Sequence, residues 1–148
     1  MKIALLGYGK MGKVIEEIAL KRGHSVVFKT NEASVEKDVS RADVAIDFST
    51  PETVVDNIKK CFAVNVPVVV GTTGWYERFS EVCRLCELSG HSLFHATNFS
   101  IGVNIFFEVN KTLAKLMNTQ PDYEIEMTEI HHTQKLDAPS GTAISLAE

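Results

Sequence analysis

The segment between Glu129 and Thr142 concentrates side chains that can move protons and bind anions. It contains two imidazoles, His131 and His132, and one ammonium group, Lys135, followed by Pro-Ser-Gly-Thr at 139–142. A histidine with an unperturbed pKa of about 6.5 can donate a proton near neutral pH, which suits reduction of a carbon–nitrogen double bond. Together these residue types predict a site that binds a small anion and delivers a proton to it.

A helix is expected to begin near Ser140, and its first turn is the predicted anion-binding element. The first N–H groups of a helix have no partner within the helix, so Ser140, Gly141 and Thr142 can bind a carboxylate. Lys135 adds a full positive charge. The implied ligand is anionic.

The two histidines allow other interpretations. On a regular strand His131 and His132 would point to opposite faces, so at most one would enter a given pocket, although their place at a strand end weakens this restriction. A metal site is a second possibility. Adjacent histidines with the distant His91 and His95 match no helix-spaced ligand pair or zinc signature, so we expect no metal.

A second cluster, near the amino terminus, has the spacing of a dinucleotide-binding loop. The sequence G-Y-G-K-M-G at residues 7–12 is a complete G-x-G-x-x-G between a strand pattern and a helical pattern. In such a loop Gly7 permits the tight turn, Gly9 lets the backbone approach a pyrophosphate, and Gly12 lets helix and strand pack closely. The motif predicts dinucleotide binding; a glycine-rich turn without a ligand is the alternative.

The end of the second predicted strand lacks the acid that usually binds the adenine ribose about 20 residues after such a loop. Lys29, Thr30 and Asn31 stand there instead. Asn31 could bond a ribose hydroxyl, and Lys29 could either meet a 2′-phosphate or be a solvated strand end. With no carboxylate to repel that phosphate, we expect NADPH to be accepted beside NADH.

Two further loops follow predicted strands, at the sheet edge that faces a bound cofactor. Asp47-Phe48-Ser49-Thr50 could flank the middle of the cofactor, and the backbone of Gly71-Thr72-Thr73-Gly74 could contact nicotinamide. Each loop by itself could equally be an ordinary turn.

Apolar runs and helical patterns alternate over the first hundred residues, and the runs lack the alternation of a half-exposed sheet. Alternation of this kind predicts an α/β fold with a Rossmann-like, doubly wound parallel sheet. The expected strands are Lys2–Leu6, Ser25–Lys29, Val44–Asp47, Val66–Val70 and Ser92–Ala96, and the expected helices begin at Met11, at Pro51 and near Tyr76.

The pattern changes after the fifth strand. A long amphipathic helix is predicted to end at Asn118, with its apolar stripe at Ile105, Phe106, Val109, Leu113, Leu116 and Met117. Residues 122–130 then alternate polar and apolar side chains, which predicts a strand with one wet face. We therefore expect a dinucleotide-binding domain at 1–120 and the beginning of a second, α+β substrate domain at 121–148, left incomplete at Glu148.

Composition excludes several classes of protein. The 148 residues are 45% hydrophobic and 23% charged, without repeats or low-complexity tracts, which indicates a folded globular chain. A net charge of -4 with scattered lysines and arginines argues against nucleic acid and membrane surfaces as partners. We expect a cytoplasmic protein with three thiols, and Cys83 and Cys86 fall on the predicted inner face of a helix rather than in a redox motif.

These residues resemble those of 4-hydroxy-tetrahydrodipicolinate reductase, formerly called dihydrodipicolinate reductase. The longest matching block is H-H-T-Q-K-L-D-A-P-S-G-T-A at residues 131–143. Further matching blocks, in the order that the family has them, are residues 7–12, 47–49, 71–74 and 96–104. The resemblance covers nearly the whole chain.

The resemblance implies hydride transfer from NADPH or NADH to the ring of a small dicarboxylate, with loss of water, giving tetrahydrodipicolinate for lysine and diaminopimelate synthesis. By the matched positions, His131 would donate the proton, Lys135 would assist it and stabilise charge, and His132 would contact substrate. Ser140, Gly141 and Thr142 would hold a carboxylate. Together with the loop positions above, the residues expected to line the cofactor are Gly7, Gly9, Lys10, Met11, Gly12, Asn31, Phe48, Ser49, Gly71, Thr72, Thr73, Ala96, Thr97, Asn98 and Phe99.

Members of the family continue for about another domain, through a substrate-domain sheet that forms a homotetramer. Asn31 stands where many members carry an acid, which leaves the preference between NADH and NADPH open. The main alternative is a truncated, catalytically incompetent NAD(P)H-binding module. A different Rossmann oxidoreductase acting on another small anion is a third possibility, and the segment at residues 131–142 argues against it.

Overall fold

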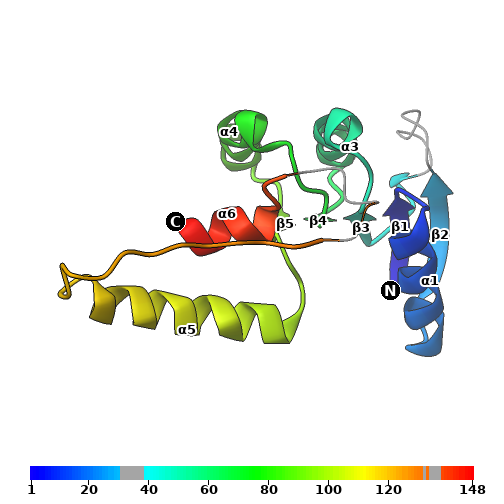
Figure 1. Cartoon of the computed structure of the whole chain (residues 1–148). Coiled ribbons are helices and arrows are strands. Elements are labelled where there is room, and N and C mark those ends of the chain that lie inside the picture. The colour runs from blue at the N-terminus through cyan, green and yellow to red at the C-terminus, as the bar shows by residue number, and fades with distance from the viewer. Residues whose placement is uncertain (31–38, 132, 134–137) are drawn as a thin grey trace. The chain divides into compact units, whose positions relative to one another are not determined.

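The computed structural model describes residues 1–30, 39–131, 133 and 138–148 (Figure 1). Its contacts divide the chain into two compact units, Met1–Ala96 and Thr97–Glu148. The domain boundary expected near residue 120 stays a prediction, because compact units need not coincide with evolutionary or folding domains.

The first unit is built on a five-stranded, all-parallel sheet in the order β2-β1-β3-β4-β5. This confirms the predicted Rossmann-like α/β class. The chain places β2 on one side of β1 and then adds β3 on the other, so the topological switch point lies between β1 and β3. The strands are β1 (Lys2–Leu6), β2 (Ser25–Thr30), β3 (Val44–Asp47), β4 (Val68–Val70) and β5 (Leu93–His95).

Helices cover both faces of the sheet, as the alternation of side chains along β1 shows. Ala4 and Leu6 belong to a core cluster with buried residues of α3 and α4. Ile3 and Leu5 point the other way and pack with Ala19 of α1. The helical elements of this unit are α1 (Lys10–Lys21), α3 (Pro51–Ala63), the single 3-10 turn η1 (Tyr76–Arg78) and α4 (Phe79–Ser89), with α3 and α4 side by side in Figure 1.

Two of the predicted strands are longer than the structure has them. The expected strand from Val66 begins at Val68, and the expected strand from Ser92 begins at Leu93. The Val66 N–H donates to the carbonyl of Cys61 at 3.0 Å, so this residue completes the end of α3 instead of entering the sheet. Apolar side chains alone therefore overestimated the length of the strand.

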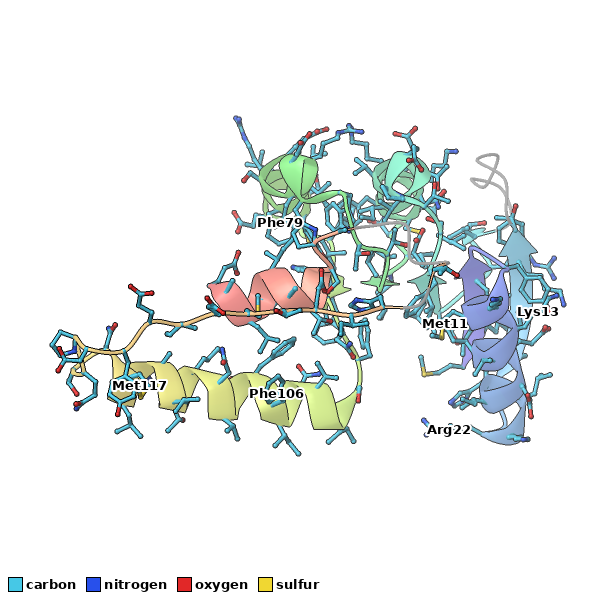
Figure 2. All side chains as sticks on the ribbon, in the orientation of Figure 1. Met11, Lys13, Arg22, Phe79, Phe106 and Met117 are labelled. Atoms are coloured by element: carbon cyan, nitrogen blue, oxygen red, sulfur yellow. The ribbon has the colours of Figure 1, made fainter. Side chains whose placement is uncertain are left out.

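The second unit contains α5 (Ile101–Met117) and α6 (Gly141–Ala147). The predicted end of α5 at Asn118 is confirmed, and α6 follows Ser140 as expected. An apolar groove of about 850 Å³ runs along α5, and Figure 2 shows Phe106 and Met117 along this helix. The exposed apolar side chains of α5 include Ile101, Ile105, Phe106, Val109, Leu113 and Leu116.

The strand predicted at residues 122–130 is wrong. The structure has no strand pairing over this segment, and its side chains are exposed. A strand needs a neighbour to take up its backbone hydrogen bonds, and the described residues supply none beside it. The alternating side chains mark a segment suited to a sheet, but alternation does not provide the partner.

Among the described residues, no helix is both long enough and apolar enough to cross a membrane.

Candidate functional site

The glycine loop between β1 and α1 has a backbone that side chains would disrupt. Gly7 adopts a positive φ of 86°, and a Cβ there would stand 2.1 Å from the carbonyl oxygen of Phe48. A Cβ at Gly12 would stand 2.4 Å from the Gly7 carbonyl oxygen, so this glycine allows α1 to approach the loop closely. These are the roles that the motif predicts for its first and third glycines.

The middle glycine faces open space. Apart from its chain neighbours and the backbone of its own helix, no described atom lies within 4 Å of a Cβ built at Gly9. Gly9 is the N-cap of α1, and the first turn of that helix carries no acidic side chain. The first N–H groups of a helix have no partner within the helix, and together with the positive end of the helix dipole they favour an anion at this point, so the loop fits a dinucleotide pyrophosphate.

A buried carboxylate, Asp47, holds together the loops that follow β3 and β4. Its Oδ1 accepts hydrogen bonds from the Ser49 N–H at 3.0 Å, the Ser49 hydroxyl at 2.7 Å and the Thr72 hydroxyl at 2.6 Å. Its Oδ2 accepts from the Asn57 amide of α3 at 2.8 Å. The Ser49 N–H also reaches the Thr72 hydroxyl at 2.8 Å. The hydroxyl groups of Ser49 and Thr72 are thus engaged in joining the loops.

The loop after β4 is shaped by close packing against Phe48. A Cβ on Gly71 would meet the Phe48 ring at 2.2 Å, so only glycine lets the ring lie against this backbone. The buried indole of Trp75 donates to the Thr72 carbonyl at 2.8 Å. Both loops expected to flank the cofactor therefore lie beside each other at the carboxyl ends of β3 and β4.

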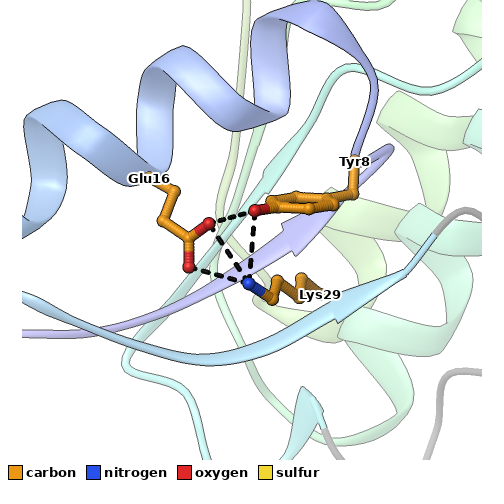
Figure 3. Close-up of polar contacts among 3 residues, drawn as sticks. All are labelled: Tyr8, Glu16 and Lys29. Atoms are coloured by element: carbon orange, nitrogen blue, oxygen red, sulfur yellow. Dashed lines mark hydrogen bonds and ion pairs between the residues drawn. The ribbon is translucent and has the colours of Figure 1, made fainter.

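Side chains of the glycine loop, α1 and β2 meet in one cluster: Tyr8, Glu16 and Lys29 (Figure 3). Lys29 Nζ lies 3.0 Å and 3.2 Å from the two Glu16 oxygens, 3.2 Å from the Tyr8 hydroxyl and 4.5 Å from the centre of the Tyr8 ring. The Tyr8 hydroxyl donates to Glu16. The ion pair with Glu16 argues against Lys29 as a simply solvated strand end, and its contact with a 2′-phosphate stays a prediction.

The ionisation of this cluster follows from its contacts. Hydrogen bonds from Tyr8 and then from Lys29 lower the pKa of Glu16, and the hydrogen bond to Glu16 is the main cause that raises the pKa of Lys29. Both directions favour the charged forms at neutral pH. The sequence did not indicate Glu16, because its partner lies 13 residues away on another element.

In the second unit, Glu129 binds the start of α6. Its Oε1 accepts from the Ser140 N–H at 2.8 Å and its Oε2 accepts from the Ser140 hydroxyl at 2.6 Å. The Ser140 hydroxyl accepts from the Ala143 N–H at 3.0 Å, which caps the helix. His131 Nδ1 lies 3.5 Å from Glu129 Oε2. Glu129 was not among the predicted site residues, and its place two residues before His131 was the only signal in the sequence.

The segment that leads into α5 also contacts α6. The hydroxyl groups of Thr97 and Ser145 lie 3.1 Å apart, and the Asn98 amide donates to the Thr142 hydroxyl at 3.3 Å. Two expected cofactor-binding residues thus touch the same helix as the expected carboxylate-binding residues. Ala96 is the last residue of the first unit, while Phe99 is exposed in the second. Three expected site residues, Asn31, His132 and Lys135, lie outside the described residues.

In the first unit, side-chain packing surrounds Cys61, Cys86, His91 and His95. Burial, and then the charge of Asp47, raise the pKa of Cys61 to about 12, which keeps this thiol protonated. Cys86 packs against the core of the first unit, as its helical position predicts, and burial raises the pKa of Cys83. His91 stacks on Phe62 with ring centres 4.5 Å apart, and burial lowers the pKa of His95.

Comparisons with known proteins agree with this architecture over both units. Residues 1–99 match the family model described as dihydrodipicolinate reductase, N-terminus, and residues 102–148 match the one described as dihydrodipicolinate reductase, C-terminus. Among solved structures, a dipicolinate-bound dihydrodipicolinate reductase from Paenisporosarcina sp. TG-14 is similar, with a TM-score of 0.70 and 28% identity. That likeness covers 99% of this chain and 64% of the other.

Curated relatives carry the corresponding modern name. A 4-hydroxy-tetrahydrodipicolinate reductase of Christiangramia forsetii is 49% identical over 150 residues, and one of Neisseria gonorrhoeae is 34% identical over 173 residues. Both alignments include the whole of this chain, which spans 63% of the length of each relative. The two family models match almost every residue in order, so this chain belongs to the dihydrodipicolinate reductase family.

Proposed function

We propose that this protein takes part in the NAD(P)H-dependent reduction of 4-hydroxy-tetrahydrodipicolinate to tetrahydrodipicolinate, in the diaminopimelate and lysine pathway. The observation that carries the proposal is a match along the whole of this chain, at 49% identity, to a relative with this reductase name. It is supported by a glycine loop whose middle residue leaves room for a pyrophosphate. The activity is that of an oxidoreductase, and we expect it in the cytoplasm.

The first unit supplies most of the cofactor site in this proposal. The nicotinamide cofactor, when bound, supplies the hydride. The N–H groups at the start of α1 would hold the pyrophosphate of the cofactor. The backbone of the two loops that Asp47 joins would contact the remaining parts of the cofactor. The proposed cofactor residues are Gly7, Gly9, Lys10, Met11, Gly12, Asn31, Phe48, Ser49, Gly71, Thr72, Thr73, Ala96, Thr97, Asn98 and Phe99.

The second unit supplies the substrate-binding groups. His131 donates a proton to the substrate, and Lys135 assists it and stabilises negative charge. His132 contacts the substrate. The carboxylate of Glu129 already engages the N–H and hydroxyl of Ser140, so the amides of Gly141 and Thr142 are better placed to take a substrate carboxylate. The similar reductase from Paenisporosarcina binds dipicolinate, which is a dicarboxylate of the expected class.

The resemblance implies that members of the family form a homotetramer through the substrate-domain sheet. The exposed apolar side chains along α5 are a separate surface that further protein could cover.

The alternative is an NAD(P)H-binding module without turnover; the chain spans 63% of the length of its Christiangramia forsetii relative. One experiment separates the two. The purified chain is mixed with NADPH, and substrate is made in the same cuvette by the preceding synthase. Oxidation of the cofactor is followed by its absorbance, and binding is followed by its fluorescence. We expect fluorescence to change, and turnover to require synthase, its substrates and this chain together.

The outcomes are distinct. Absorbance loss that depends on the chain and the synthase supports the reductase. A fluorescence change without absorbance loss supports the binding module and contradicts catalysis by this chain. A parallel reaction with the synthase omitted corrects for cofactor decay.

A further inference from the structure

The cluster of Tyr8, Glu16 and Lys29 occupies the place where a Rossmann fold distinguishes NADH from NADPH. In this fold the pyrophosphate lies on the glycine loop and the adenine ribose lies beside the end of the second strand. Lys29 is the second-last residue of β2, and the Gly7 N–H donates to the Thr30 carbonyl at 2.8 Å, which joins the loop to that strand end. In the usual arrangement of this fold, a cation beside this strand end can attract the 2′-phosphate that only NADPH carries.

The ammonium group of Lys29 is already engaged. An ammonium has three N–H donors, and Lys29 Nζ lies within 3.2 Å of three acceptor oxygens, two from Glu16 and one from Tyr8. An arriving 2′-phosphate would have to displace Glu16 or bind with that carboxylate beside it. The negative charges of the Glu16 carboxylate and of a neighbouring phosphate would repel each other, even in water.

Tyr8 strengthens this arrangement from within the glycine loop. Its hydroxyl donates to Glu16, and its ring lies beneath the Lys29 ammonium at 4.5 Å. The side chains of Lys29 and Glu16 are 46% and 20% exposed, so the pair borders the solvent from which a nucleotide arrives. Glu16 is therefore held in place by two partners, and the local charge of the pair is zero.

We propose that Glu16 is a specificity-determining residue, which holds Lys29 in a neutral pair and thereby favours NADH over NADPH. This inference rests on the proposed nucleotide binding of the first unit and adds the identity of the nucleotide to it. Glu16 acts through Lys29, and so it is a positioning residue that does not itself contact the reacting atoms.

The test is direct binding of NADH and of NADPH to the 148-residue chain, measured by isothermal titration calorimetry. Glu16→Gln keeps the shape of the side chain and changes the local charge from zero to plus one. We expect NADPH to bind about five- to tenfold more tightly, as for one charge about 6–8 Å from a phosphate in water-like surroundings, and NADH to change less than about twofold. The gain should shrink as salt is added.

Two further variants complete the series. Lys29→Gln removes the cationic partner of Glu16 and leaves a local charge of minus one, so NADPH should bind about five- to tenfold more weakly than to the wild type while NADH changes little. In the double variant the local charge returns to zero, and the ratio of the two affinities should return to within about twofold of the wild-type ratio. Each ratio is measured on one protein, so a partly unfolded sample lowers both apparent binding stoichiometries without moving the ratio.

Glu17→Gln is the matched control. It makes the same change of charge at the next residue of α1, where Glu17 pairs with Lys21 at 2.7 Å on an exposed surface. The NADPH-to-NADH ratio of this variant should equal that of the wild type.

Three results would overturn the proposal. If the wild type prefers NADPH, and only Lys29→Gln removes that preference, then Lys29 binds the phosphate directly and Glu16 does not oppose it. If Glu16→Gln changes both affinities by the same factor, its role is structural. If the folded wild type binds neither nucleotide, the proposed nucleotide binding fails as well, whereas the first two results leave it intact.

Discussion

At the scale of single residues, the Asp47 carboxylate joins the loops after β3 and β4 to α3. Its two oxygens accept four hydrogen bonds, from Ser49, Thr72 and Asn57, and the side chain is fully buried. A carboxylate suits this position because it has two acceptor oxygens and no hydrogen to place. The loops after β3 and β4 owe their shared shape to this group.

Asp47→Asn should therefore destabilise the protein by about 2–3 kcal/mol, because the new amide must aim its N–H groups at donors on one side or the other. The free energy of unfolding is measured by urea denaturation followed by circular dichroism. Asp56→Asn, the same substitution at an exposed position of α3, is the control and should change the free energy by less than about 0.5 kcal/mol. Equal unfolding midpoints for the two variants would contradict the structural role of Asp47.

At the scale of elements, the two helices of the second unit begin differently although each follows a serine. Ser140 caps α6, since its hydroxyl accepts from the Ala143 N–H at 3.0 Å, while its own groups bind Glu129. Ser100 precedes α5 and makes no capping bond with its side chain. The serine side chain therefore caps α6 but does not cap α5.

Ser140→Ala should expose the first turn of α6 to solvent, because it removes the cap and one bond to Glu129. We expect a loss of about 1 kcal/mol in the local opening free energy of residues 141–147, read as faster amide hydrogen exchange by mass spectrometry. Ser100→Ala is the matched control, and exchange in the first turn of α5 should stay as it is in the wild type. Similar acceleration in both helices would show that the cap at Ser140 is unimportant.

At the scale of the whole molecule, the hydrophobic core is unevenly divided. Both clusters of buried apolar residues lie between Ile3 and Val82, inside the first unit. In the second unit the apolar face of α5 is exposed within the described residues, and burial is concentrated at residues 140–143. Stability should therefore come almost wholly from the first unit.

A fragment of residues 1–96 should unfold in one cooperative thermal transition, because it keeps the sheet, its helices and both clusters. A fragment of residues 97–148 is the counterpart and should show a gradual loss of helical signal without a cooperative midpoint. Circular dichroism and differential scanning calorimetry measure both. A gradual melt of the 1–96 fragment would mean that its core depends on the rest of the chain.

Much of this protein was determined by local sequence. The strands Lys2–Leu6 and Val44–Asp47, the helix after the glycine loop and the start of a helix at Ser140 lie where the sequence predicts them. Strand and helix patterns, glycine positions and capping residues act over a few neighbouring residues, so they can be recognised without knowing what the chain packs against. The dinucleotide loop is likewise a local motif.

Tertiary structure decided which distant side chains meet. The pairing of Glu16 with Lys29, the bonds from Thr72 and Asn57 to Asp47 and the contact of Glu129 with Ser140 each join residues that are 10 or more positions apart. Their distances depend on how a helix is rotated on a sheet or where a loop crosses a strand end, which no short pattern encodes. The same reason explains the error at residues 122–130: alternation favours a strand, but only a neighbouring strand can complete its hydrogen bonds.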